Sequence, residues 1–288
     1  MKKWIPALLL ILFTSSVQAQ VTVNNLLCEN RENPLGVDVP APRFNWALQS
    51  DRRGVTQSAY EIRVAPSATD LNKERNLVWN SGKINTAASV HVRYAGAALA
   101  PGKSYYWQVR IWDELGKASS WSKPAFWQTG LLDNANWKAK WIAEATADTI
   151  SGPSPLFRRA FNSPKKIAAA TLFITCHGLY EAFINGKKAG NGLLTPGFTS
   201  YNKRLQYQAY DVSTLIHPGK NVIGAMLGSG WYRGPLAWAG HNNIYGNDLA
   251  LLAQLEIRYT DGSAETIISD DQWKTSRGAI LYSEIYNG

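Results

Sequence analysis

Cysteine, histidine and methionine are scarce in this chain of 288 residues, which contains two, four and two of them respectively. No cysteine or histidine stands at the spacing of a zinc site, so the sequence gives no support for metal catalysis through these ligands. Cys28 and Cys176 fall in strands of two different predicted domains. We expect both thiols to be buried as small apolar groups, although an oxidising compartment would allow them to pair.

Charge is also sparse, at 18% of the residues, and the net charge of +9 is spread evenly along the chain. A nucleic-acid-binding protein would gather its basic residues on one element or face. No apolar run reaches the roughly 20 residues that a membrane-spanning helix needs. The sequence therefore predicts no nucleic-acid partner and no membrane span in the mature chain.

The first residues have the pattern of a secretory signal peptide. Lys2 and Lys3 precede an apolar run that ends at Phe13, and small residues suited to a signal peptidase follow as far as Ala19. We therefore predict that residues 1–19 are removed and that the mature protein is secreted or periplasmic.

Aromatic residues, by contrast, are abundant, with 12 Trp and 13 Tyr, and they favour strands because they pack well on a pleated surface. Residues 60–64 and 105–111 alternate with the period of two that one buried strand face requires. Short strands separated by turn formers predict an antiparallel sandwich over residues 20–130. This domain resembles a fibronectin type III or immunoglobulin-like module in four segments: Leu99 to Tyr105, Trp107 to Arg110, Gly116, and Trp121-Ser122.

Residues 131–155 are predicted to be a linker, and residues 156–288 a second β-sandwich of jelly-roll type, which makes the fold class all-β. Ala182 to Ile184 followed by Asn185-Gly186 is the strongest hairpin signal, because Asn-Gly adopts the positive φ angles of a type I′ turn at little cost. Residues 211–216 are predicted to form one capped helical turn.

The stretch from Gly228 to Pro235 is rich in glycine and contains Trp231, Tyr232 and Arg233. Aromatic faces stack on sugar rings, arginine bonds hydroxyls, and glycine allows close backbone approach, so this loop is a candidate sugar-binding site. The alternative is that Trp231 and Tyr232 close the end of the sandwich while Arg233 pairs with a local acid or carbonyl groups.

No catalytic set can be assembled from the residues themselves. Ser229 lacks the spacing of a hydrolase nucleophile. The pairs Asp113-Glu114 and Asp270-Asp271 are adjacent, so their side chains point to opposite faces of an extended chain. Catalytic carboxylates of glycosidases instead converge across a cleft, roughly 5–10 Å apart. We therefore predict that both pairs are turn residues.

Five ordered motifs and a closing segment stand out in the second domain: Gly178 to Glu181, Ile184 to Lys187, Leu194 to Tyr201, Tyr207 to Val212, Leu227 to Gly234, and Ile280 to Gly288. They resemble the amino-terminal region of bacterial α-L-rhamnosidases, glycoside hydrolase family 78. The fibronectin-like domain also stands where those enzymes carry one, so the resemblance covers essentially the whole mature chain.

The resemblance implies a hydrolase of terminal α-L-rhamnosyl bonds that acts with inversion, through an acid and a base in an (α/α)6 barrel after these sandwiches. This chain is expected to lack that barrel, so no catalytic residue carries over and we expect it to be inactive by itself. The implied partners are rhamnose-containing glycans and a missing catalytic barrel. The chain would then come from a truncated reading frame or a separately encoded fragment.

Some family members have a rhamnose-binding, calcium-assisted jelly roll in this region. The resemblance therefore implies sugar contacts from Asn185, Trp231, Tyr232 and Arg233. The Asn185-Gly186 turn lacks the carboxylate that would strengthen binding of a hard cation, so we expect no cofactor, with calcium as the alternative. The expected function is an accessory, non-catalytic region of a secreted rhamnosidase, and the alternative is a stand-alone rhamnose-binding module.

Overall fold

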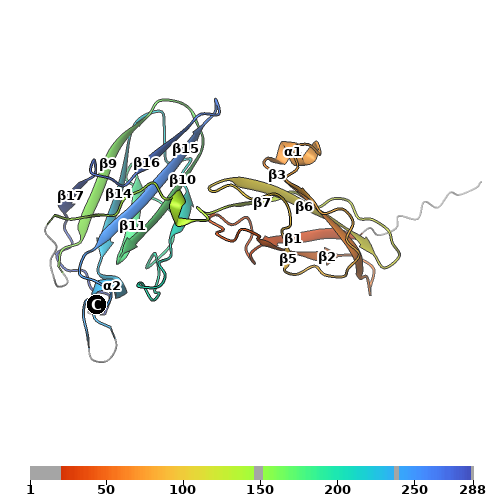
Figure 1. Cartoon of the computed structure of the whole chain (residues 1–288), viewed down its shortest axis with the longest axis horizontal. Helices are drawn as coiled ribbons and strands as arrows, with labels where there is room; N and C mark the ends of the chain where they lie inside the picture. The colour runs from red at the N-terminus through yellow and green to blue at the C-terminus, as the bar shows by residue number, and fades with distance from the viewer. Residues whose placement is uncertain (1–20, 146–151, 237–239, 287–288) are drawn as a thin grey trace, which may run out of the picture. The chain divides into compact units, whose positions relative to one another are not determined.

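A computed structural model describes residues 21–145, 152–236 and 240–286. The predicted signal peptide lies outside the described residues. The chain divides into two compact units, the first built mainly from residues 43–97 and 106–125 and the second mainly from residues 126–288. Both units consist of antiparallel sheets, as the abundance of aromatic residues predicted (Figure 1).

The first unit is an immunoglobulin-like sandwich of a three-stranded and a four-stranded sheet. The three-stranded sheet has the order β1 (Thr22–Cys28), β2 (Arg43–Gln49), β5 (Val92–Arg93). The four-stranded sheet has the order β4 (Trp79–Asn80), β3 (Gln57–Ala65), β6 (Ser104–Asp113), β7 (Ala125–Gln128). A short helix, α1 (Ala68–Asn72), follows β3. Phe44 of β2 and Trp107 of β6 join the two sheets, with ring centroids 4.4 Å apart and both side chains fully buried.

The outer face of β3 is buried as well, which the alternating pattern did not predict. Glu61 and Arg63 point to this face and are 6% and 9% exposed. The guanidinium carbons of Arg63 and Arg110 lie 4.3 and 4.8 Å from the ring centre of Trp121 and cover it from both strands. Arg110 also donates to Glu61 at 2.8 Å. Cation–π contacts and ion pairs therefore cover the outer face of β3, which in an ordinary sandwich is exposed to solvent.

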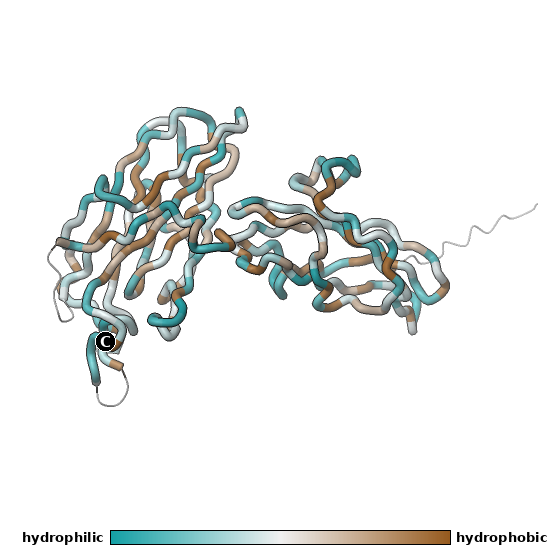
Figure 2. The backbone as a smooth tube through the Cα atoms, in the orientation of Figure 1, coloured by the Kyte–Doolittle hydropathy of each residue, from teal (hydrophilic) through white to brown (hydrophobic). Residues whose placement is uncertain are grey.

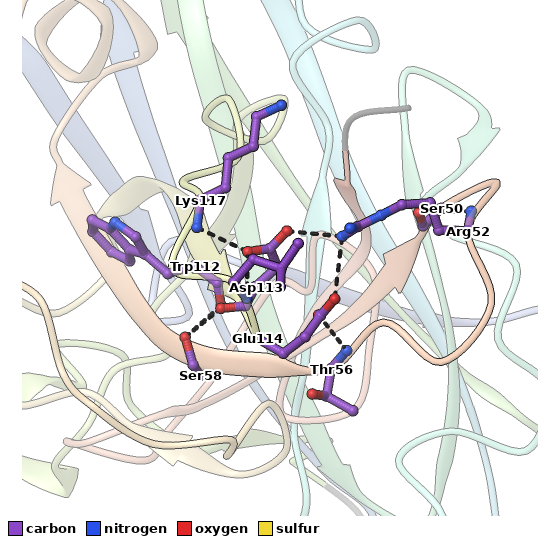
Figure 3. A network of polar contacts seen from close by, with 9 residues as sticks. Ser50, Arg52, Thr56, Ser58, Trp112, Asp113, Glu114 and Lys117 are labelled. Carbon is purple, nitrogen blue, oxygen red and sulfur yellow. Dashed lines mark hydrogen bonds and ion pairs between the residues drawn. The ribbon is translucent and has the colours of Figure 1, made fainter. Parts of the chain in front are cut away.

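A buried carboxylate organises the turn after β6 (Figure 3). Asp113 is 2% exposed, and its Oδ1 accepts from the backbone amides of Lys117 and Leu115 at 2.8 and 3.0 Å. Its Oδ2 accepts from Arg52 at 2.8 Å. Burial alone would raise the pKa of Asp113, but the two amides and the guanidinium outweigh it and hold the pKa below its usual value. The prediction that Asp113 is a turn residue is confirmed.

The second unit is a sandwich of two five-stranded sheets. The first sheet has the order β13 (Gln208–Asp211), β10 (Ile167–His177), β15 (Ala250–Tyr259), β16 (Ala264–Ile268), and β8 (Ile142–Ala143) also pairs with β15. The second has the order β12 (Lys187–Lys188), β11 (Leu179–Ile184), β14 (Gly219–Gly228), β9 (Pro155–Ser163), β17 (Lys274–Arg277). Between the sheets lies one apolar core from both, and hydrophobic residues recur along these strands in Figure 2.

Several local predictions can be compared directly with this unit. Asn185 and Gly186 have φ angles of 52° and 78°, so the predicted hairpin turn is confirmed. Residues 211–216 form no helical turn, because β13 extends to Asp211, whose Oδ1 accepts the Ser213 amide at 2.9 Å and starts a tight turn instead. Part of the expected linker, β8, belongs to a sheet of the second unit. A 3-10 turn, η1 (Asn134–Asn136), precedes it.

The two cysteines are free and buried, in β1 and β10. Burial raises the pKa of both thiols, so they remain protonated at neutral pH. The expectation of two small apolar groups is confirmed.

Candidate functional site at one end of the second sandwich

The glycine-rich stretch forms a single helical turn, α2 (Gly230–Arg233), directly after β14. Gly230 has a φ of 51°, and a Cβ there would come within 2.5 Å of Leu179, so a larger residue would not fit. Ser229 is fully buried, and its Oγ accepts from the Arg233 guanidinium at 3.1 and 3.3 Å. Arg233 is itself only 5% exposed. Its guanidinium is therefore held inside the protein, with the Ser229 hydroxyl as a partner.

Tyr232 lies in a column of stacked rings. Its ring is nearly parallel to that of His177, with centroids 4.5 Å apart, and His177 stacks in turn on Trp141 at 4.2 Å. The edge of Tyr201 meets Tyr232 at 5.5 Å, and Tyr245 meets Tyr201 at 5.0 Å. Tyr232 is 9% exposed, one face of its ring lies against His177, and Tyr201 packs on it nearly at right angles, so most of the ring is buried.

The column is uncharged at neutral pH. Burial lowers the pKa of His177, and the carboxylate of Asp248 offsets this only in part. Burial and the same carboxylate raise the pKa of Tyr232, and burial raises the pKa of Tyr201 to about 12. The rings therefore act as packing groups at neutral pH, and His177 is held as a neutral imidazole.

Trp231 belongs to a partly exposed group of rings, which meets this column where Phe198 packs on Tyr201 with centroids 6.2 Å apart. Its Nε1 donates to the hydroxyl of Tyr286 at 3.1 Å, and its ring centroid lies 5.6 Å from that of Phe198. Phe198 and Tyr286 are 55% and 59% exposed. We call these three side chains the Phe198 surface. Sequence reasoning missed Phe198 and Tyr286 as site residues, although both stand in motifs that carry the family resemblance.

A buried polar network holds the segment that carries Phe198. The Tyr180 hydroxyl donates to Gln208 at 2.7 Å, and the Gln208 amide donates to the carbonyl of Pro196 at 3.1 Å. Thr195 donates to the carbonyl of Tyr180 at 2.9 Å. Burial raises the pKa of Tyr180 far above its usual value, so its hydroxyl stays a donor. These bonds fix the backbone two residues before Phe198.

The structure does not bring Asn185 to the other predicted sugar contacts. Leu179, at the start of β11, pairs with Gly228 beside α2, whereas Asn185 follows the other end of β11. Six residues of strand separate the two places, which is about 20 Å at 3.3 Å per residue. The prediction of one site containing Asn185, Trp231, Tyr232 and Arg233 therefore does not match the geometry, since only Trp231 presents a ring at the surface.

The side chain of Asn185 is engaged in the hairpin. Its amide donates to the carbonyl of Leu215 at 2.9 Å and to Asn221 Oδ1 at 2.8 Å, and its Oδ1 accepts from the Val222 amide at 2.9 Å. Asn221 Oδ1 also accepts from the amide of His217 at 3.1 Å. Both amide oxygens thus already accept N–H groups, and no carboxylate belongs to this set. The donor set does not fit a calcium ion, which prefers several oxygens including carboxylates.

Elsewhere, no cluster of three or more His, Cys, Asp or Glu side chains suited to a metal occurs among residues 21–145, 152–236 and 240–286. Asp270 is paired with Arg159 at 2.8 Å, and its other oxygen accepts the Gln272 amide at 3.0 Å. This arrangement confirms that Asp270 is a turn residue.

Two family models match the chain. "Alpha-L-rhamnosidase N-terminal domain" matches residues 165–288, and "Rha78A-like, N-terminal immunoglobulin domain" matches residues 23–133. An α-L-rhamnosidase from Formosa agariphila is 38% identical over 274 residues, which is 91% of this chain and 29% of the relative. The chain thus spans less than a third of that relative's length.

Solved structures agree with these matches. An α-L-rhamnosidase from Dictyoglumus thermophilum superposes with a TM-score of 0.85 at 37% identity and covers 93% of this chain and 31% of its own. The crystal structure of an α-L-rhamnosidase from Streptomyces avermitilis, complexed with L-rhamnose, gives a TM-score of 0.88 at 26% identity over 93% of this chain and 42% of its own.

Proposed function

Because this chain comprises N-terminal domains of the α-L-rhamnosidase family, glycoside hydrolase family 78, we propose that it is an accessory, non-catalytic region. It would support the hydrolysis of terminal α-L-rhamnosyl residues by a catalytic part that lies elsewhere in a rhamnosidase. The observation that carries the proposal is the end of the second sandwich, where Tyr232 and Arg233 are buried in packing contacts. A site that binds and cleaves a glycan would instead expose such groups to a cavity.

The carboxylates of the second unit also favour a supporting role. An inverting glycosidase needs one carboxylic acid with a raised pKa and one carboxylate that activates water. Hydrogen bonds from Lys165 and Ser263 lower the pKa of Asp261, which is the opposite of what a general acid requires. Glu181 is paired with Lys188, and Asp270 with Arg159. These pairs tie neighbouring strands and turns together.

The proposal is tested with a chromogenic α-L-rhamnoside. The chain alone is expected to give no turnover, whereas the remaining part of the Formosa agariphila relative should gain stability or activity when this chain is supplied with it. Turnover by the chain alone that a point substitution within residues 156–288 abolishes would refute the non-catalytic assignment.

A second candidate is a stand-alone rhamnose-binding module, which the Streptomyces avermitilis complex with L-rhamnose favours. Of the four predicted contacts, Trp231 is the one whose ring reaches the surface next to other aromatic rings. Calorimetry with L-rhamnose, with and without a chelator, tests this candidate. Binding that Trp231→Ala abolishes and Val90→Ala, at an exposed site of the first unit, preserves would support it. No heat at millimolar sugar would rule it out.

We also propose that the protein is exported to the periplasm or beyond, on the basis of the two lysines, the apolar run and the small residues before position 20. Within the part of the chain that the structure describes, no helix is long and apolar enough to cross a membrane. Amino-terminal sequencing of the protein recovered from cell fractions tests this prediction. A cytoplasmic protein that retains Met1 would contradict it.

A further inference from the structure

The Phe198 surface is made by three segments that are distant in sequence. Phe198 belongs to the loop between β12 and β13, which the hydrogen bonds of Tyr180 and Gln208 hold in place. Trp231 belongs to α2, and Tyr286 to the segment that follows β17. Exposed apolar side chains also occur close by in the sequence: Leu193 and Leu194 precede Phe198 in the same loop, and Ile244 adjoins Tyr245, which packs on Tyr201. Soluble proteins rarely expose such a group of large apolar residues unless something binds there.

The segment with Tyr286 runs closely along α2. The Ser283 hydroxyl would lie 2.6 Å from a Cβ at Gly228, and a Glu284 oxygen 2.5 Å from a Cβ at Gly234, so side chains of this segment come close to the backbone of both glycines. Glu284 also accepts the amides of Ile285 and Tyr286, at 2.7 and 3.3 Å. Residues 283–286 are thereby held beside α2 and the Phe198 surface.

We propose that the Phe198 surface is a docking surface for the part of an α-L-rhamnosidase polypeptide that follows these domains. This inference rests on the proposed function. The chain covers only 29–32% of three curated relatives, so a large body of polypeptide is joined to the matched region in each of them. Such a body can cover rings that this chain by itself leaves exposed to solvent. Trp, Tyr and Phe are also the residues that form the buried centres of protein interfaces.

The chemistry of the surface favours a polypeptide over a sugar. A sugar site needs polar groups that fix its hydroxyls, but the Phe198 ring has none, and the Nε1 of Trp231 is already bonded to the hydroxyl of Tyr286 at 3.1 Å. The nearby guanidinium of Arg233 lies 3.1 Å from Ser229 and is buried. Contacts between domains of one polypeptide bury about 600–1,500 Å², and exposed aromatic rings such as Phe198 and Tyr286 can form the buried centre of such a contact.

Hydroxyl-radical labelling of the full chain, alone and joined in frame to the remaining part of the Formosa agariphila relative, tests the proposal. Phe198 and Tyr286 are more than half exposed in this chain, so full burial in an interface should lower their labelling by about fivefold. Trp231 should be protected together with them. Leu115, which is 72% exposed in the first unit, serves as the control and should be labelled equally in both proteins.

Two substitutions, one in the Phe198 surface and one in the first unit, provide a further test of the docking surface. Phe198→Glu should leave the melting temperature of the separate chain unchanged but restore labelling of Trp231 and Tyr286 in the fusion, whereas Leu115→Glu should leave both the melting temperature and the protection in the fusion unchanged. Mixing the two parts as separate polypeptides should give the same protection as fusing them. Unchanged labelling in both formats would overturn the proposal.

Other occupants give different results. Protection of the separate chain by its own high concentration would show that a second copy covers the surface, and protection by L-rhamnose would show a sugar platform; either result refutes the proposal. Rhamnosidase activity reports on the proposed function separately. An active fusion with an unprotected surface refutes the docking surface alone, whereas turnover by the separate chain refutes the accessory role alone.

Discussion

Replacing Asn185 should destabilise the second sandwich even though this residue lies far from the aromatic rings. Its side chain makes three hydrogen bonds, to the carbonyl of Leu215, to Asn221 and from the amide of Val222. Each such bond contributes about 0.5–1.5 kcal/mol net. Asn185→Gly keeps the φ of 52° at little strain but loses these three bonds, so we expect a loss of about 1.5–4.5 kcal/mol in unfolding free energy.

Asn185→Ala should be worse than Asn185→Gly. A side chain with a Cβ costs roughly 1–2 kcal/mol in the left-handed region, while the stiffer unfolded chain of alanine returns about 0.4–1 kcal/mol. The net difference between the two variants is about 0.5–1 kcal/mol. Asn185→Asp retains the acceptor for Val222 and should lie between wild type and glycine.

Urea unfolding of the full chain, followed by a probe in the second unit, measures these differences. The expected order of stability is wild type, Asp, Gly, Ala. If Asn185→Ala unfolds within about 0.5 kcal/mol of wild type, the hydrogen bonds contribute nothing and Asn185 is free to bind a ligand instead. If alanine is more stable than glycine, the strain argument is wrong.

Three further outcomes follow from the packing and the pKa directions. Asp113→Asn should cost about 1–2 kcal/mol at pH 7 in urea unfolding. Because the folded pKa of Asp113 lies below the unfolded value of about 3.9, its contribution is complete above that pH and the deficit of the variant should shrink as the pH falls through the lowered pKa. Trp121→Ala removes the ring that contacts Arg63 and Arg110, and should lower the unfolding free energy, measured by thermal unfolding, by about 1–2 kcal/mol. An unchanged unfolding free energy would show that these cation–π contacts contribute nothing to stability. His177 has a lowered pKa, so the unfolded state binds its proton more readily and wild-type stability should fall below about pH 6.5. His177→Phe should lack this fall, and equal pH profiles would contradict the neutral stacked imidazole.

The strands could be predicted from sequence because their information is local. Alternation in residues 105–111 and the Asn185-Gly186 turn correspond to β6 and to the β11–β12 hairpin, whose period and φ angles these residue types favour by themselves. The turn after β13 was mispredicted because Asp211 can bond a following amide in a tight turn as well as at a helix start.

The candidate site could be predicted only in part, because its contacts join distant segments. Trp231 meets a tyrosine 55 residues later, and neither periodicity nor composition relates the two positions. Tyr232 looked available for sugar stacking because its sequence neighbours are glycines, but His177 from β10 covers its ring. A glycine-rich aromatic motif therefore indicates close packing as readily as it indicates a ligand.

The borders of the second sandwich bear on how this domain avoids aggregation. One of its sheets ends on β12, which consists of Lys187 and Lys188, and on β17, which begins with Lys274 and whose four residues are all exposed. Short edge strands with lysine discourage pairing with strands of another chain. Neighbouring copies at high local concentration are thereby kept from joining their sheets edge to edge.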